Sequence, residues 1–267
     1  MTAFAANSIF CRLALGGTQI DPATFTLVRL LSGAAMLWLV VRIRSGAGPR
    51  RGDWRSALGL FAYAAAFSYA YVNLTAGTGA LLLFGSVQAT MILAGLVRGE
   101  RLNGWQTAGL VLAVGGLVVL VLPGVTQPPW ASALLMTGAG IAWGIYSLRG
   151  RGATAPTATT AGNFVLAAVP ALGLSLATLP WFAWDPRGAV YAVLSGALAS
   201  GWGYAIWYAA LPALRATQAA SVQLSVPVIA ALGGVFLLGE VMTLRLAWCS
   251  AAVLGGIALV LKARRPR

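Results

Sequence analysis

The sequence has little charge and almost none of the residues that build metal or redox sites. It contains no histidine, two cysteines (Cys11 and Cys249) and five acidic residues in a chain of 267. No metal-ligand cluster, thiol redox motif or nucleophile–base pair can be assembled from this set. We therefore expect no cofactor, no metal and no enzymatic activity. Both cysteines fall inside apolar stretches and are expected to be buried free thiols.

The low charge also argues against a soluble domain. Charged residues make up 9% of the chain and hydrophobic residues 59%, whereas a soluble domain usually carries about a quarter charged residues. A helix needs about 20 apolar residues to cross the hydrocarbon core of a bilayer. Ten such spans are predicted, and they leave no room for a soluble domain. They are 2–15, 22–43, 54–74, 79–97, 104–122, 130–148, 156–179, 187–210, 214–237 and 243–262.

The positive charge is gathered at the ends of the predicted spans. The 18 lysines and arginines give a net charge of +13 but form no continuous basic stripe, so no nucleic-acid partner is expected. With ten spans and the N-terminus inside, the positive-inside rule places 14 of the 18 on the inner side. They are Arg42, Arg44, Arg50, Arg51, Arg55, Arg98, Arg101, Arg149, Arg151, Arg215, Lys262, Arg264, Arg265 and Arg267. We expect a multi-pass protein of a bacterial-type inner membrane with both termini cytoplasmic. No cleavable signal peptide is expected, because the start lacks positive charge.

The chain repeats itself at a shift of 140 residues. Gly99-Glu100 falls on Gly239-Glu240, and Gly115-Gly116 falls on Gly255-Gly256. Such pairs recur by chance in apolar helices, but the common register over about 50 residues favours a true repeat. Since a five-helix unit crosses the membrane an odd number of times, its second copy must enter from the opposite side. This architecture is typical of transporters whose site lies near the midplane, between the halves.

The predicted fold is therefore an all-α integral membrane protein of ten transmembrane helices. It consists of two inverted five-helix repeats, at 1–125 and 126–267.

An ordered set of residues in both halves matches a known family. In the second half the set is Tyr204, Trp207, Tyr208, Ala210, Leu211, Ala216–Ser221, Pro227, Gly239-Glu240 and Gly255-Gly256. In the first half it is Arg12, Arg29, Ala80–Leu83, Gly99-Glu100-Arg101, Gln106, Gly109 and Gly115. In order and spacing these residues resemble the EamA-type transporters of the drug/metabolite transporter superfamily, and within it the amino-acid exporters, including exporters of aromatic amino acids. The chain departs from the family at Val87, where the family often has proline. Gly85 and Ser86 are the candidates for flexibility there.

All five acids lie in predicted loops or at span ends: Asp21, Asp53, Glu100, Asp185 and Glu240. A proton-coupled multidrug antiporter needs a carboxylate deep in the membrane. We therefore expect transport without proton coupling. Glu100 and Glu240 are expected to cap the helices that follow them, where negative charge is favoured.

Arg12 and Arg29 fall within predicted spans, where an unpaired guanidinium is costly. We favour snorkelling to the outer interface, or pairing with Asp21 and helix carbonyls. The alternative is a contact with a solute carboxylate or phosphate. Sugar-phosphate relatives in the superfamily are expected to need a central Lys or Arg, and the only lysine, Lys262, lies at the far end of the chain.

Aromatic residues form rows at helical spacing. These rows are Tyr63 with Phe67, Trp143 with Tyr146, and Tyr204 with Trp207. A cavity lined by them would suit an apolar or aromatic side chain, or an ammonium group on the ring faces. Plain helix packing is the alternative. Seven other tryptophans are expected at span ends or on the lipid face: Trp38, Trp54, Trp105, Trp130, Trp181, Trp184 and Trp248.

Polar residues within the spans need a partner or water. Pro227 cannot donate to the carbonyl of Gln223 and kinks the helix there. This break serves either a solute or a hydrogen bond between helices.

The predicted function is export of small organic solutes, with amino acids or related metabolites favoured, by alternating access. The predicted substrate-binding residues are Asn7, Tyr63, Phe67, Ser86, Trp143, Tyr146, Tyr204, Trp207 and Gln223, with hinges at Gly85 and Pro227. The expected partners are a small-molecule substrate and the lipid bilayer, and the chain is expected to be a monomer. The alternatives are a multidrug or lipophilic-cation exporter, and a non-transporting membrane scaffold with a closed, dry core.

Overall fold

The computed structural model describes residues 1–45, 52–99, 101–124, 127–150, 153–210, 213 and 222–262. Across these residues the chain is helical and has no strand, as the sequence predicts. The α-helices are α1 (Thr2–Gly17), α2 (Pro22–Ser45), α3 (Trp54–Tyr71), α4 (Ala76–Val97), α5 (Gly104–Val121), α6 (Trp130–Arg149), α7 (Pro156–Ala177), α8 (Pro186–Val193), α9 (Gly203–Ala210), α11 (Ser225–Leu238) and α12 (Leu244–Lys262). The 3₁₀ turn η1 (Leu179–Trp181) and the π-helix η2 (Leu194–Trp202) complete the order.

The predicted spans agree with these helices to within three residues at each end, apart from 214–237, whose first part lies outside the described residues. Glu100 also lies outside them. The start of one helix was predicted three residues too far along the chain, at position 79. Helix α4 begins at Ala76, because the Thr75 side chain caps it by accepting a hydrogen bond from the backbone N–H of Thr78, as N-cap threonines do.

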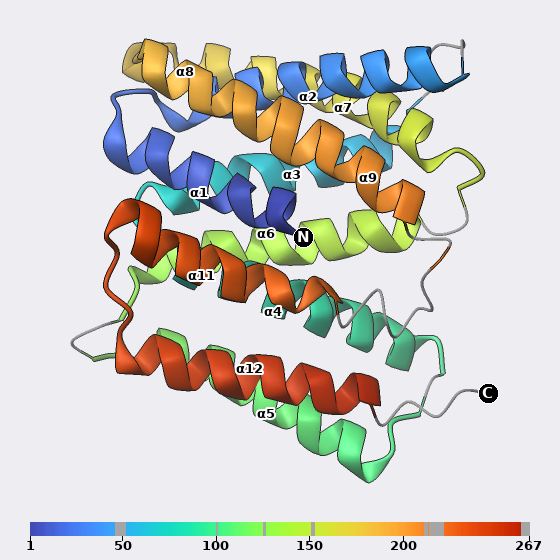
Figure 1. Cartoon of the computed structure of the whole chain (residues 1–267), viewed down its shortest axis with the longest axis vertical. Helices are drawn as coiled ribbons and strands as arrows, with labels where there is room; N and C mark the ends of the chain where they lie inside the picture. The colour runs from blue at the N-terminus through green and yellow to red at the C-terminus, as the bar shows by residue number, and fades with distance from the viewer. Residues whose placement is uncertain are drawn as a thin grey trace.

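The helices lie side by side, with their connections gathered at two opposite edges of the molecule (Figure 1). At one end of the long axis α2 packs against α7, with α8 and α9 alongside; at the other end α5 packs against α12. Between them lie α1, α3, α4, α6 and α11. Helix α1 starts near the centre of the bundle, where the N-terminus lies.

In the described part of the chain, seven helical segments are long and apolar enough to cross a membrane. They are Pro22–Arg44, Ala76–Val97, Gly104–Val121, Trp130–Arg149, Pro156–Ala177, Pro186–Ala210 and Leu244–Lys262. This agrees with a multi-pass membrane protein. The count of ten crossings and the inverted repeat remain predictions.

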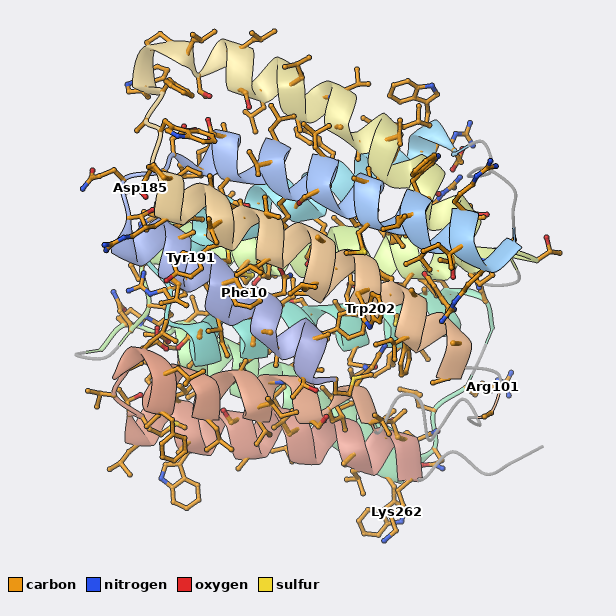
Figure 2. All side chains as sticks on the ribbon, turned by 45° about the horizontal axis from the view of Figure 1, so that its top comes forward. Phe10, Arg101, Asp185, Tyr191, Trp202 and Lys262 are labelled. Atoms are coloured by element: carbon orange, nitrogen blue, oxygen red, sulfur yellow. The ribbon has the colours of Figure 1, made fainter. Side chains whose placement is uncertain are left out.

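Charged and aromatic residues are placed as a bilayer requires. Arg101 and Lys262 lie at one edge of the bundle and Asp185 lies at the opposite edge (Figure 2). The seven tryptophans expected at span ends or on the lipid face are all between 49% and 74% exposed. The apolar outer surface of the bundle therefore suits lipid.

Two glycines bring α5 and α12 into backbone contact. A Cβ atom added at Gly109 would meet the carbonyl oxygen of Gly256, and one added at Gly256 would meet that of Gly109. Neighbouring Gly255 and Gly115 face open space. Small residues at such a crossing let van der Waals contact hold the helices together in lipid.

We expect Gly256→Ala to lower the unfolding free energy of the detergent-solubilised protein by about 1–3 kcal/mol, because the new methyl group forces two backbones apart. Gly255→Ala is the matched control and should leave the midpoint of thermal unfolding unchanged or slightly higher. Equal destabilisation by the two variants would contradict the close α5–α12 contact.

Candidate functional site

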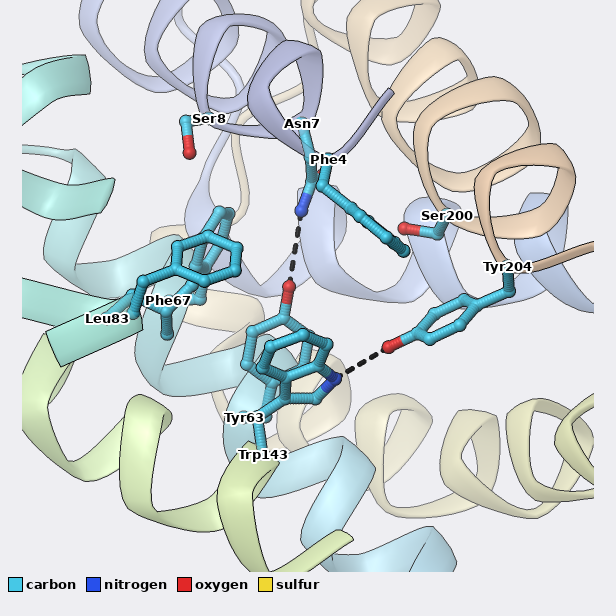
Figure 3. Close-up of a pocket in the computed structure, with 10 residues that line it drawn as sticks. Phe4, Asn7, Ser8, Tyr63, Phe67, Leu83, Trp143, Ser200 and Tyr204 are labelled. Carbon is cyan, nitrogen blue, oxygen red and sulfur yellow. Dashed lines mark hydrogen bonds between the residues drawn. The ribbon is translucent and has the colours of Figure 1, made fainter. Parts of the chain in front are cut away.

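A small cavity with a mainly apolar wall and a few amide and hydroxyl groups lies in the middle of the bundle, between α1, α3, α4, α6, η2 and α9. Its volume is about 10 Å³, room for about one water molecule. The lining residues are Phe4, Asn7, Ser8, Tyr63, Phe67, Leu83, Phe84, Trp143, Ser200 and Tyr204 (Figure 3). They come from both predicted halves of the chain. In the described conformation the cavity is too small for an organic solute.

Hydrogen bonds join the polar groups around the cavity. The Asn7 Nδ2 donates to the Tyr63 hydroxyl at 3.2 Å, and the Trp143 Nε1 donates to the Tyr204 hydroxyl at 2.6 Å (Figure 3). The Oδ1 of Asn7 accepts a 2.5 Å bond from Ser195 on η2. All five residues are buried, so each of these bonds offsets the cost of removing a polar atom from water.

Aromatic rings form the rest of the cavity wall. The ring of Phe4 meets those of Trp143 and Tyr204 edge-on, at centroid distances of 6.3 and 5.5 Å. The Tyr63 ring lies 6.0 Å from Trp143 and 5.4 Å from Phe67. This is the packing that aromatic quadrupoles favour, and it joins α1, α3, α6 and α9 around one point.

Arg29 corrects the sequence-based expectation. It neither snorkels to an interface nor pairs with Asp21: only 2% of it is exposed. Its Nη2 donates to the Tyr63 hydroxyl at 2.8 Å. The guanidinium carbon lies 5.1 Å from the centre of the Tyr63 ring and 4.7 Å from that of Phe67. Its Nη1 is buried, and no described residue accepts a hydrogen bond from it.

Five of the nine predicted binding residues line the cavity: Asn7, Tyr63, Phe67, Trp143 and Tyr204.

The other four lie outside the cavity wall. Ser86 is buried against Gly140. Tyr146 donates to Thr160 at 3.4 Å. Trp207 is partly buried and reaches the site through an edge contact with Phe4 at 6.5 Å. Gln223 is partly buried and precedes α11. Their role in binding stays a prediction.

The two predicted hinges show different surroundings. Helix α4 runs without a break through Gly85, which packs closely against Leu117. At the other position the helix is interrupted at Leu224, so Pro227 falls in the first turn of α11. A proline there removes no helical hydrogen bond.

Five lining residues are not among the predicted binding residues: Phe4, Ser8, Leu83, Phe84 and Ser200. Phe4 precedes Asn7 by three positions and shares its helical face, which was an available signal. Ser200 lies in η2, where nine consecutive residues are π-helical. A π-helix changes the register of the faces beyond it, and no spacing rule for an α-helix finds such a residue.

Ion pairs link helices at both edges of the described bundle. Arg12 pairs with Glu240 at 3.4 Å and also donates to the carbonyl oxygens of Tyr71 and Val72 at the end of α3. Arg12 thus finds the helix carbonyls that were expected, but its acid partner is Glu240 rather than Asp21.

Glu240 was expected to cap the helix that follows it, but its carboxylate lies elsewhere. It accepts hydrogen bonds from the backbone N–H of Ala76, at the start of α4. Partial burial raises the pKa of the Glu240 carboxyl, opposed by the Ala76 N–H and by Arg12. A cavity of about 300 Å³ opens beside this pair, bounded by the ends of α1 and α11.

At the opposite edge, Arg149 pairs with Asp53 at 2.7 Å. The hydrogen bond from Arg149, with a second from Ser56, lowers the pKa of Asp53 to about 2. Because the folded-state pKa is depressed, this contribution to stability is present above the unfolded value and is lost as the pH falls toward 2. The pair is therefore intact at physiological pH.

The sequence profile of the EamA-like transporter family matches this chain twice, at residues 1–122 and 130–262. An uncharacterized protein of Pseudomonas aeruginosa is 58% identical over 268 residues, covering 100% of this chain and 93% of the relative. An uncharacterized transporter of Archaeoglobus fulgidus is 27% identical and covers 78% of this chain and 77% of its own length.

A probable terminal-alkyne amino-acid exporter of Streptantibioticus cattleyicolor is 28% identical, over 69% of this chain and 64% of its own length. A solved crystal structure superposes with a TM-score of 0.69 at 22% identity, covering 99% of this chain and 97% of that one. This last likeness concerns the fold alone.

The shared acceptor in the polar network gives a stability prediction. Tyr63→Phe removes the oxygen that accepts from both Arg29 and Asn7, so we expect the unfolding free energy to fall by about 1–3 kcal/mol for each donor left unpaired. Tyr208→Phe, which loses only a 3.5 Å contact from Thr160, is the control. Thermal unfolding in detergent measures both variants, and similar losses would argue against the network.

Proposed function

The chain belongs to the EamA-like transporter family of the drug/metabolite transporter superfamily, and on this premise we propose that it exports amino acids or related small metabolites by alternating access. Members of this family are transporters, not enzymes. The observation that carries the proposal is the central cavity: aromatic rings surround buried amide and hydroxyl groups at its core. Rings suit the side chain of an amino acid, and the polar groups suit its charged end.

The proposed two-half architecture has support from packing. The family profile matches each half separately. Helices that the 140-residue shift relates to one another also pack against one another: α2 against α7, α4 against α11, and α5 against α12. Contacts of this kind are expected along the axis that relates two inverted halves.

The proposed mechanism alternates the opening of the two edges. The cavity of about 10 Å³ must widen to admit a solute, so helices have to separate at one edge at a time. Arg12 with Glu240 links α1, α3 and α4 to the α11–α12 connection at the edge expected to face outward. Arg149 with Asp53 links α6 to the start of α3 at the other edge. We assign these pairs as the outer and inner latches.

We propose that transport is not coupled to the movement of protons. Glu240 lies in the connection between α11 and α12, and Asp53 directly precedes α3, so both sit at helix ends rather than deep in the membrane, where proton coupling needs a carboxylate. A solute flux driven by a pH gradient alone would contradict this.

The proposed setting is a bacterial-type inner membrane, with a monomer and cytoplasmic termini. The charge asymmetry of the sequence supports the cytoplasmic termini, and the apolar membrane-length helices support the membrane setting. A scaffold role is disfavoured, because the family transports solutes and the buried centre holds hydrogen-bonded amide and hydroxyl groups.

The aromatic wall predicts unequal effects of two tryptophans. In proteoliposomes, Trp143→Ala should lower amino-acid efflux about tenfold or more, because Trp143 lines the cavity and orients Tyr204. Trp207→Ala should have a smaller effect, since it touches the site only through Phe4. Trp248→Ala, on the exposed surface, is the control. If both Trp143→Ala and Trp207→Ala leave efflux unchanged in folded protein, the aromatic cavity is not the solute site.

The outer latch predicts a change in accessibility. Cys11 is fully buried beside Arg12, and it can be probed alone in a Cys249→Ala background. Arg12→Gln and Glu240→Gln should each speed its labelling by a membrane-impermeant maleimide added from outside, because the helix ends separate more often. Arg149→Gln, at the other edge, is the control and should not raise labelling from outside. Equal labelling rates in all variants would rule out the outer latch.

A further inference from the structure

The central region holds a positive charge that no acid balances. Arg29 is 2% exposed, and within the described residues the two ion pairs use other arginines. The acid closest to Arg29 along the chain is Asp21, which directly precedes α2. It lies eight positions away, which corresponds to about 12 Å of helical rise. Its carboxylate is already bound by the backbone N–H groups of Ala23, Thr24 and Ala183. A buried charge without a partner is strongly unfavourable, so such an arrangement needs a reason.

Arg29 is held in place without being neutralised. One donor, Nη2, is fixed by the Tyr63 hydroxyl, and the faces of Tyr63 and Phe67 stabilise the cation through their ring quadrupoles. Both rings also line the central cavity. The other terminal nitrogen, Nη1, keeps its donors unused. A guanidinium presents its donors in a planar fork that matches a carboxylate.

The hydrogen-bond count around the cavity shows an excess of donors. The Tyr63 oxygen accepts from both Arg29 and Asn7, so its own hydrogen is left to donate. The Asn7 oxygen accepts from Ser195, and among the described residues the Asn7 amide nitrogen donates to Tyr63 alone, which leaves one amide hydrogen unused. The Tyr204 oxygen likewise accepts from Trp143 and retains its hydrogen. A site of this composition needs a ligand rich in acceptors, and the nearby charge requires that ligand to be negative.

We propose that Arg29, with Tyr63 and Asn7, forms a subsite for the carboxylate of the transported solute. The inference rests on the proposed function and narrows its substrate class: solutes with a free carboxylate bind, whereas their amides and lipophilic cations do not. In the described conformation Arg29 stands one hydrogen bond behind the cavity wall, through Tyr63. Binding at this subsite therefore requires the helices around Tyr63 to separate, so that the solute can reach the Nη1 of Arg29.

Matched acid and amide ligands test the subsite apart from transport. The purified protein in detergent is titrated with L-phenylalanine and L-phenylalaninamide, and with 3-phenylpropanoate and 3-phenylpropanamide, while ligand-induced stabilisation is followed by thermal unfolding. Both acids should raise the unfolding midpoint of the wild-type protein, and both amides should not. Arg29→Gln should raise the half-saturating acid concentration about tenfold or more, because a charge-assisted hydrogen bond is lost. Arg29→Lys should fall between, since it keeps the charge but not the fork.

Two controls separate this role from a merely structural one. Arg187→Gln removes an equal charge from an exposed position and should leave the acid response unchanged. Arg29→Met should not lower the midpoint of the ligand-free protein, because it deletes an unpaired buried charge. A lower midpoint with an intact acid response would overturn the proposal, because Arg29 would then be structural.

Further outcomes are decisive in the same assay. Equal stabilisation by acid and amide, no stabilisation by either acid, or a stronger response to phenyl phosphate than to the carboxylates would each overturn the subsite. Flux of the same amino acids in proteoliposomes is measured separately. Absence of flux with intact acid discrimination would sink the proposed function and uphold the subsite.

Discussion

The structure depends on one constraint: polar groups at the centre of an apolar bundle must find their partners inside the protein. The chain meets it with a line of contacts from Arg29 through Tyr63 and Asn7 to Ser195. This line crosses α2, α3, α1 and η2, so it fixes the relative positions of helices far apart in sequence. Among the described residues, the Nη1 of Arg29 is the buried nitrogen of this line that lacks a hydrogen-bond partner, and we propose that it binds the solute.

Small residues bring the helices close together, which leaves little room for water around the buried polar groups. Glycines allow backbone contact between α5 and α12, and a Cβ at Gly196 would meet the backbone of Arg29. Gly16 and Gly234 leave room for the side chains of the Arg12–Glu240 pair. With the helices this close, the centre holds about one water molecule. In the proposed mechanism, a solute can therefore bind only when helices separate and the ion pairs between them break.

Much of the helical layout could be read from the sequence, because a span is set by local hydropathy and by breakers. Three of the predicted binding residues, Asn7, Tyr63 and Trp143, line one cavity, and helical spacing identified the face that each presents on its own helix. It could not show which helix opposes that face. Tyr146 and Ser86 therefore have the right type and depth but lie outside the cavity wall.

Other features depend on contacts between distant segments. Glu240 meets the start of α4, 164 positions away, and no local rule for helix capping predicts that partner. Arg29 was expected at an interface because arginines in spans commonly snorkel. It is buried instead, where two aromatic rings on α3 stabilise its positive charge. Ser200 reaches the cavity from a π-helical turn, which periodicity of an α-helix does not reveal.

The central claim is that this family member moves carboxylate-bearing amino acids through the aromatic cavity without proton coupling. The most direct measurement is counterflow of a labelled aromatic amino acid in proteoliposomes at equal pH on both sides, with unlabelled amino acid or tetraphenylphosphonium as competitor. Accumulation that the amino acid abolishes and the lipophilic cation leaves intact is the predicted result. Competition by the lipophilic cation, or accumulation that appears only under a pH gradient, would contradict the claim.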